Sequence, residues 1–135
     1  MAQAQAAPKG RVHISPSLTS AAMRMSAKVL SAVAKRLTTE QVNSSMKRLA
    51  PEWRLGDNMQ QLERTFRFND FIGAFGFMTR VALCAEKADH HPNWSNVYNT
   101  VEVKLWTHDA GGLTEKDFSL ASQMDSSAKN TGLAA

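Results

Sequence analysis

Two segments of the chain alternate apolar and polar side chains with the two-residue period of a β-strand. They cover residues 61–68, where Arg64 interrupts an otherwise apolar face, and residues 100–108, where parity puts His108 on the polar face. A strand with one polar face belongs to a sheet that is covered on one side only, which is typical of antiparallel sheets. The alternation therefore predicts an antiparallel α+β arrangement rather than a buried parallel sheet.

Capping signals predict two shorter helices near the ends of this pattern. Thr38 and Gln41 have the spacing of a capping box, so a helix is expected over residues 39–49. Thr114 and Asp117 form a second box, which starts a final helix. Each helix is therefore expected to begin at a sharply defined residue.

A long helix is expected from Asp70 to about Ala88, with Asn69 as its cap. At 100° per residue it carries two apolar stripes roughly 120° apart. A helix that lies on a sheet needs only one apolar stripe. The second stripe needs a different surface to pack against, and the simplest candidate is the same helix of a second copy. The first stripe consists of Phe71, Phe75, Met78, Ala82 and Ala85, and the second consists of Phe77, Val81, Cys84 and Ala88.

Two shorter strand signals complete the pattern, at residues 53–55 and 96–98. Turn residues follow at Gly56-Asp57-Asn58 and, before the last helix, at Gly111-Gly112. The predicted order is helix, two strands, long helix, two strands, helix.

The charge distribution excludes several classes of protein. The net charge is +4, but residues 38–135 carry ten basic and twelve acidic side chains, so the folded part lacks the basic stripe that DNA binding requires. No window approaches the roughly 18 apolar residues of a membrane span. The single cysteine, Cys84, excludes a disulfide scaffold and a zinc finger, and a reducing, cytoplasmic compartment is the expectation.

The basic character belongs to a leader over residues 1–37, which is rich in Ala and Ser and carries six basic side chains and no acid. This composition is that of an organelle transit peptide, so import into mitochondria or another organelle is one interpretation. The other is a weakly helical or disordered extension. In both, residues 38–135 form the single folded domain.

Three of the four histidines, His90, His91 and His108, fall within nineteen positions. Imidazole titrates near neutrality, so such a cluster can supply a general acid and a general base without a cofactor. The ordinary alternative is a set of solvated loop residues. A metal site is less favoured, because adjacent histidines rarely chelate one ion well. The nearby carboxylates are Glu86, Asp89 and Asp109.

The run Glu86-Lys87-Ala88-Asp89-His90-His91-Pro92, followed by Tyr98, His108 and Asp117, resembles the signature of the pterin-4a-carbinolamine dehydratases. The resemblance spans residues 38–128. It implies an α+β fold in the order α-β-β-α-β-β-α, with a four-stranded antiparallel sheet and helices packed on one face.

The resemblance also implies an activity, the dehydration of 4a-hydroxytetrahydropterin (4a-hydroxytetrahydrobiopterin) to quinonoid dihydropterin in tetrahydrobiopterin regeneration, with no metal or cofactor. It implies that His90 and His108 transfer protons and that His91 binds and orients the pterin. Many relatives carry a small residue where this chain has Trp106. The substrate-binding residues that it implies are Glu86, Asp89, Trp106, Thr107, Asp109 and Asp117.

Structural interpretations of two of these residues stay open, since Glu86 can simply end an exposed helix and Asp117 already completes a capping box. The family implies a homotetramer built as a dimer of dimers. Some animal members are dimerisation cofactors of a homeodomain transcription factor, so a binding module that uses the long helix is the alternative function. A metal-dependent hydrolase is the third.

Overall fold

The computed structural model describes residues 34–134, so most of the expected leader lies outside the described residues. The order of the main elements agrees with the prediction, with two additional short 3₁₀ turns. The elements are α2 (Thr39–Met46), β1 (Arg54–Leu55), η1 (Asp57–Met59), β2 (Leu62–Arg67), α3 (Phe71–Ala88), β3 (Asn93–Val97), β4 (Thr100–Leu105), η2 (His108–Ala110) and α4 (Glu115–Lys129).

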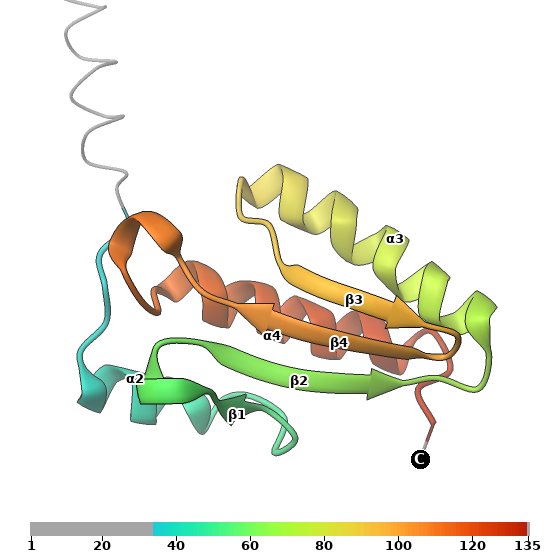
Figure 1. Ribbon diagram of the computed structural model, residues 1–135, viewed down its shortest axis with the longest axis horizontal. Coiled ribbons are helices and arrows are strands. Elements are labelled where there is room, and N and C mark those ends of the chain that lie inside the picture. The colour runs from blue at the N-terminus through green and yellow to red at the C-terminus, as the bar shows by residue number, and fades with distance from the viewer. Residues whose placement is uncertain (1–33, 135) are drawn as a thin grey trace, which may run out of the picture. The chain divides into compact units, whose positions relative to one another are not determined.

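The four strands form one sheet in the order β1-β2-β4-β3, and all neighbours are antiparallel. Leu62 at the start of β2 pairs with Leu105 at the end of β4, and Asn93 at the start of β3 pairs with Lys104. The end of β4 is therefore flanked by the starts of two strands. Helices α3 and α4 lie together on one side of the sheet (Figure 1). The predicted α+β fold is confirmed.

The core lies between the sheet and these two helices. Phe66 on β2 contacts Phe77 on α3, with ring centroids 4.7 Å apart, and Phe68 lies 5.0 Å from Phe77 by the same measure. All three rings are fully buried. Burial of each such side chain contributes about 1.5–3 kcal/mol, so this cluster anchors α3 on the sheet.

Arg64, which interrupts the apolar face of β2, is buried in an ion pair. Its guanidinium contacts Asp125 of α4 and lies 3.6 Å from Glu52, and it stacks over the Phe66 ring at 4.3 Å from the centroid. The indole Nε1 of buried Trp53 donates to Asp125 Oδ1 over 2.8 Å. Both side chains are thus structural, and the partly buried carboxylate of Asp125 on α4 explains the exception in the alternation.

The prediction for α3 was wrong in two respects. Its cap is Asp70, whose carboxylate accepts the N–H of Gly73 over 2.8 Å, rather than Asn69. The stripe expected to contact another copy is also the one that faces the core, since Phe77 and Val81 are buried while Phe71 and Phe75 of the first stripe are exposed. Periodicity on a nearly all-apolar helix does not say which side meets the sheet. The buried residues are Ala74, Phe77, Val81 and Ala85, and the exposed apolar ones are Phe71 (47%), Ile72 (80%), Phe75 (57%) and Leu83 (71%).

Three predicted boundaries also moved. The first helix ends at Met46 rather than near residue 49, and β3 starts at Asn93, three residues earlier than expected. Strand β4 ends at Leu105, so His108 lies in the turn η2 and not on a strand face. The Thr107 N–H donates to the Gly112 carbonyl over 3.0 Å, which closes a loop and takes the chain out of the sheet.

Contacts with the folded domain begin one residue before Thr38, the cap of α2. The Leu37 N–H donates to the Leu113 carbonyl over 2.8 Å, and Leu37 packs against the core. The predicted capping box itself is present, with Thr38 and Gln41 exchanging hydrogen bonds. Among the described residues, no helix is long and apolar enough to cross a bilayer.

Candidate active site

Two adjacent histidines, His90 and His91, follow the C-terminal end of α3 and point in different directions. Asp89 adopts the left-handed conformation with φ of 45°, and the His90 N–H donates back to the Ala85 carbonyl over 3.0 Å. This tight reversal buries His90 and leaves His91 exposed. A non-glycine residue in this conformation is uncommon, and such strain concentrates at functional sites.

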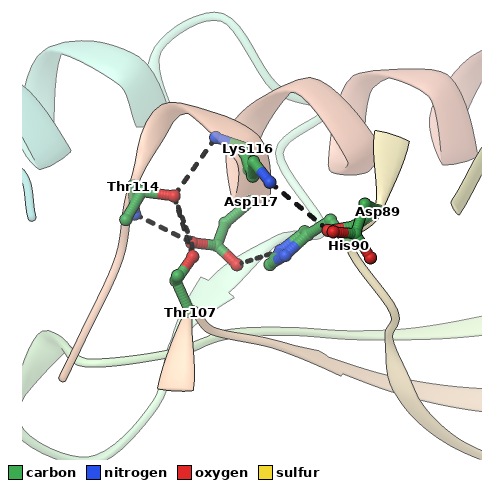
Figure 2. A network of polar contacts seen from close by, with 6 residues as sticks. All are labelled: Asp89, His90, Thr107, Thr114, Lys116 and Asp117. Atoms are coloured by element: carbon green, nitrogen blue, oxygen red, sulfur yellow. Dashed lines mark hydrogen bonds and ion pairs between the residues drawn. The ribbon is translucent and has the colours of Figure 1, made fainter. Parts of the chain in front are cut away.

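His90 is held by a buried carboxylate from the start of α4. Its Nε2 lies 2.7 Å from Oδ1 of Asp117, and the two side chains are only 8% and 0% exposed. The other oxygen, Oδ2, accepts the Thr107 hydroxyl and the Thr114 N–H, each over 2.8 Å (Figure 2). A carboxylate offers only acceptors, so Nε2 of His90 carries a hydrogen, and in the neutral ring Nδ1 keeps the lone pair.

The same network joins three elements of the fold. The hydroxyls of Thr107 and Thr114 lie 2.8 Å apart, and Lys116 Nζ donates to the Asp89 carbonyl over 3.3 Å. Figure 2 shows these side chains linking the start of α4 to Thr107 in the segment that follows β4 and to the end of α3. Asp117 also completes the predicted capping box, so its structural role and its contact with His90 coexist.

An open hollow of about 440 Å³ lies beside this network, between the start of β3 and the segment that follows β4. Its volume is within the usual range for small-molecule sites. The chain thus offers a concave surface with two imidazoles and two indoles. The lining residues are His91, Pro92, Asn93, Trp94, Trp106 and His108.

The histidines of the hollow each have a nearby carboxylate. Nε2 of His91 lies 3.0 Å from Oε2 of Glu86, and Nδ1 of His108 lies 3.6 Å from Oδ1 of Asp109. All four side chains are exposed. Ion pairs in water are worth at most about 1 kcal/mol, so these contacts orient the rings weakly, in contrast to the buried pair at His90.

The structure therefore divides the predicted site residues into two groups. His91, His108 and Trp106 surround the hollow, with Glu86 and Asp109 at its histidines. His90, Thr107 and Asp117 form the network, where the Thr107 and Asp117 side chains contact each other, and Asp89 contributes its carbonyl.

Sequence reasoning missed several residues of this site. Asn93 and Trp94 line the hollow because β3 begins earlier than predicted. Thr114 and Lys116 belong to the network, and only Thr114 gave a signal, as a helix cap. Within residues 34–134, no group of three His, Cys, Asp or Glu side chains could hold a metal ion.

Comparisons with known proteins point to the family that the sequence resembles. The family described as pterin 4 alpha carbinolamine dehydratase matches residues 35–127. A relative from Rhodopseudomonas palustris (strain BisB18) is 55% identical over 91 residues, which cover 67% of this chain and 89% of the relative. One from Nitrobacter winogradskyi (strain ATCC 25391 / DSM 10237 / CIP 104748 / NCIMB 11846 / Nb-255) is 53% identical over 97 residues, or 72% and 95% of the two chains. Both carry a provisional name as pterin-4-alpha-carbinolamine dehydratase.

Two solved structures share the fold. A protein from Brucella melitensis, described as a transcriptional coactivator/pterin dehydratase, has a TM-score of 0.67 and 45% identity, covering 70% of this chain and 99% of its own. A pterin dehydratase-like protein described as a RuBisCO assembly factor of the α-carboxysome has a TM-score of 0.50 and 23% identity, covering 57% and 89%, and is similar in fold alone. The family match covers residues 35–127, and the relatives are more than 50% identical over two thirds or more of this chain. The chain therefore belongs to the pterin-4-alpha-carbinolamine dehydratase family.

Proposed function

We propose that this protein dehydrates 4a-hydroxytetrahydropterins to quinonoid dihydropterins by histidine acid–base catalysis, as a step in tetrahydrobiopterin regeneration. The observation that carries the proposal is the gathering of three histidines at one end of the sheet, where one of them, His90, is fixed by Asp117 at 2.7 Å. Family membership gives the reaction class, and the open hollow provides room for a bicyclic ring.

The reaction needs two proton transfers. The hydroxyl on C4a leaves as water when its oxygen receives a proton, and a C4a–N5 double bond forms when N5 loses one. A protonated imidazole donates the first proton and a neutral imidazole accepts the second, so the two rings exchange protonation states and solvent resets them. Each well-placed imidazole contributes about 10²–10⁴ in rate.

The contacts support the following roles. His108, exposed at the wall of the hollow, and His90 transfer the two protons, and His90 acts through Nδ1 because Asp117 occupies Nε2. His91 orients the ring from the other wall. Trp106 offers an aromatic surface against which a flat heterocycle can stack.

The test is turnover of chemically generated 4a-hydroxytetrahydropterin, corrected for the nonenzymatic reaction, with and without a chelator. Activity that survives the chelator is the expected result. Activity that is lost on chelation would indicate a metal-dependent enzyme instead. Absence of turnover would overturn the proposal in favour of a binding module.

We further propose that copies of the chain associate as a dimer of dimers through two different surfaces. The exposed apolar side of α3 is one, since Phe71, Ile72, Phe75 and Leu83 lie open. The other is the outer edge of β3, which ends the sheet and carries none of the Lys or Pro residues that usually protect an edge within its sequence NWSNV. Two distinct self-complementary surfaces are what a dihedral tetramer requires.

A binding role for the same helix is the second candidate function. It is favoured by the exposed apolar side of α3 and by the description of the Brucella melitensis relative as a transcriptional coactivator as well as a dehydratase. Such a role would coexist with catalysis, because this side of α3 is opposite the face that packs on the sheet.

A further inference from the structure

The segment just before α2 pairs with the part of the chain that leads from β4 to α4. The Leu37 N–H donates to the Leu113 carbonyl over 2.8 Å, and the Leu37 side chain packs against the core. Leu113 follows the turn η2 and the two glycines that end the loop of His108. Residues 36–37 therefore lie alongside residues 112–113, next to the loop that carries one of the site histidines.

The side chain of Arg36 lies against the backbone of Gly112. A β-carbon built on Gly112 would be only 2.7 Å from Nε of Arg36, closer than real β-carbons come to other atoms, and 3.2 Å from Cζ. Among the described glycines, Gly111 and Gly132 have a positive φ, so the backbone conformation of Gly112 is open to other residues. Glycine also allows another group to approach the backbone closely. The contact with Arg36 is therefore what requires glycine at position 112.

Gly112 closes the loop on which His108 lies. The Thr107 N–H donates to the Gly112 carbonyl over 3.0 Å, and the Gly112 N–H donates back to the Thr107 carbonyl over 3.4 Å. Within the loop, the Gly111 N–H donates to the His108 carbonyl over 3.0 Å. The His108 side chain is 93% exposed, and its one ion-pair partner within residues 34–134, Asp109, is on the same loop and 95% exposed. The backbone of the loop therefore determines where the His108 ring lies.

Side chains from two directions contact the closed end of this loop. The Thr107 hydroxyl donates to Oδ2 of Asp117 over 2.8 Å, which holds the Thr107 side, and Arg36 contacts the Gly112 side. An ion pair does not explain the place of Arg36, because none joins its guanidinium to a carboxylate within residues 34–134. Packing on the glycine backbone is thus the contact through which Arg36 acts on the loop.

These contacts connect Arg36 with the position of His108. We propose that Arg36 is a positioning residue, which packs on Gly112 and holds residues 107–112 so that His108 reaches the reacting atoms of the substrate. The inference rests on the proposed dehydratase function and adds a residue to its machinery. A small displacement of a reacting group lowers the rate steeply. Because His108 is proposed to act in the transition state, the loss of Arg36 should lower kcat rather than raise KM.

The experiment breaks the contact from both sides. Arg36→Ala removes the side chain, and Gly112→Ala places a methyl group in the space that Arg36 occupies. Lys35→Ala, at the neighbouring exposed basic residue, is the matched control. We expect Arg36→Ala and Gly112→Ala each to lower kcat about tenfold with KM nearly unchanged, and the control to keep its kcat. The double variant should lose no more than either single variant, because both substitutions remove the same contact.

A spectroscopic measurement keeps this test independent of turnover. In ¹H–¹⁵N spectra of the imidazole rings, the His108 signals should shift in Arg36→Ala, whereas those of His90 should stay in place because Asp117 holds that ring.

Unchanged His108 signals or wild-type kcat in Arg36→Ala would overturn the inference, as would an equal loss of kcat in Lys35→Ala or a double variant whose losses multiply. Thermal unfolding would show whether Gly112→Ala folds, and Arg36→Ala decides the question if it does not. Absence of turnover in the unmodified protein would overturn the dehydratase function, while the His108 signals would still decide whether Arg36 holds the loop.

Discussion

The imidazole Nε2 of His90 lies 2.7 Å from a carboxylate oxygen of Asp117, and the pair is buried where the end of α3 meets the start of α4. The second oxygen of this carboxylate accepts the Thr107 hydroxyl and the Thr114 N–H. Because Asp117 cannot rotate without losing these bonds, the His90 ring has one orientation and one tautomer. Charge-assisted bonds of this kind are roughly twice as strong as neutral ones.

Replacement of Asp117 by Asn should lower kcat by about 10²-fold or more. The amide nitrogen would donate to Nε2 of His90, so the hydrogen of the neutral ring would move to Nδ1, the atom that we propose accepts a proton from the substrate. Steady-state kinetics would measure the loss, and ¹⁵N chemical shifts of the ring would report the tautomer.

Glu115→Gln is the matched control for this variant, because Glu115 also lies in the first turn of α4 but is exposed, and within residues 34–134 its one ion-pair partner is Arg48, at 3.4 Å. It should keep its kcat. If Asp117→Asn retained both wild-type kcat and wild-type tautomer, Asp117 would be a helix-capping residue only.

The three histidines should divide into two kinetic classes. Removal of a proton-transfer group lowers kcat and kcat/KM together, whereas removal of uniform binding raises KM alone. His90→Ala and His108→Ala should each lower kcat by about 10²-fold or more, and His91→Ala should act mainly on KM. The rates must be corrected for the appreciable nonenzymatic dehydration.

Single variants should also discriminate between the two stereoisomers at C4a, since the hydroxyl can face either histidine, and the double variant should be inactive toward both. A large kcat effect of His91→Ala with little effect of His90→Ala would instead assign proton transfer to His91 and His108, the two histidines that line the hollow. Wild-type kcat in both His90→Ala and His108→Ala would refute the acid–base site.

Local patterns predicted most of this fold, because strand alternation and capping boxes involve residues a few positions apart. Both capping boxes were found at the predicted threonines, Thr38 and Thr114. The cap of α3 was misplaced by one residue because Asn69 and Asp70 are both good capping residues. Nothing in the sequence distinguished the two.

Contacts between residues that are far apart in the sequence could not be predicted from such local patterns. His90 and Asp117 are 27 positions apart, and their elements meet only through the tertiary packing in which α3 and α4 contact each other. The Asp125 partner of Arg64 is 61 positions away. The resemblance implied that Asp117 belongs to the site but did not predict its contact with His90.

Two ion pairs that α4 makes should differ strongly in their effect on stability. Asp125→Ala would leave the buried Arg64 guanidinium with exposed Glu52, at 3.6 Å, as its remaining acidic partner and would remove the acceptor of the Trp53 indole N–H. Because Glu52 stays in place, the loss of stability should be somewhat smaller than the about 3–5 kcal/mol of a buried charge left with no partner. Glu115→Ala breaks only the exposed pair with Arg48 and should cost less than about 1 kcal/mol.

Urea unfolding followed by tryptophan fluorescence would measure both free energies. The comparison is direct because both acids lie on the same helix. Equal losses in the two variants would show that the Arg64 charge is solvated when Asp125 is removed.

The exposed side of α3 should control assembly without controlling the fold. Ile72 and Leu83 are eleven positions apart, which at 100° per residue places them on the same side of the helix, and they are 80% and 71% exposed. Val81 lies on the other side, fully buried against the sheet. Ile72→Glu and Leu83→Glu should therefore give folded protein that forms smaller assemblies. Val81→Glu should instead unfold the chain, because it places an unpaired charge in the core.

Light scattering at micromolar concentration would give the masses, and thermal unfolding would show whether each variant is folded. The unmodified protein should have the mass of four chains, because the α3 side and the β3 edge supply two separate contacts. Loss of the α3 contact alone should then stop at two chains, since pairing along β3 uses backbone groups that neither substitution changes. A monomeric mass for the unmodified protein would rule out the assembly, and a single step from four chains to one in Leu83→Glu would show that the edge of β3 does not hold a dimer by itself.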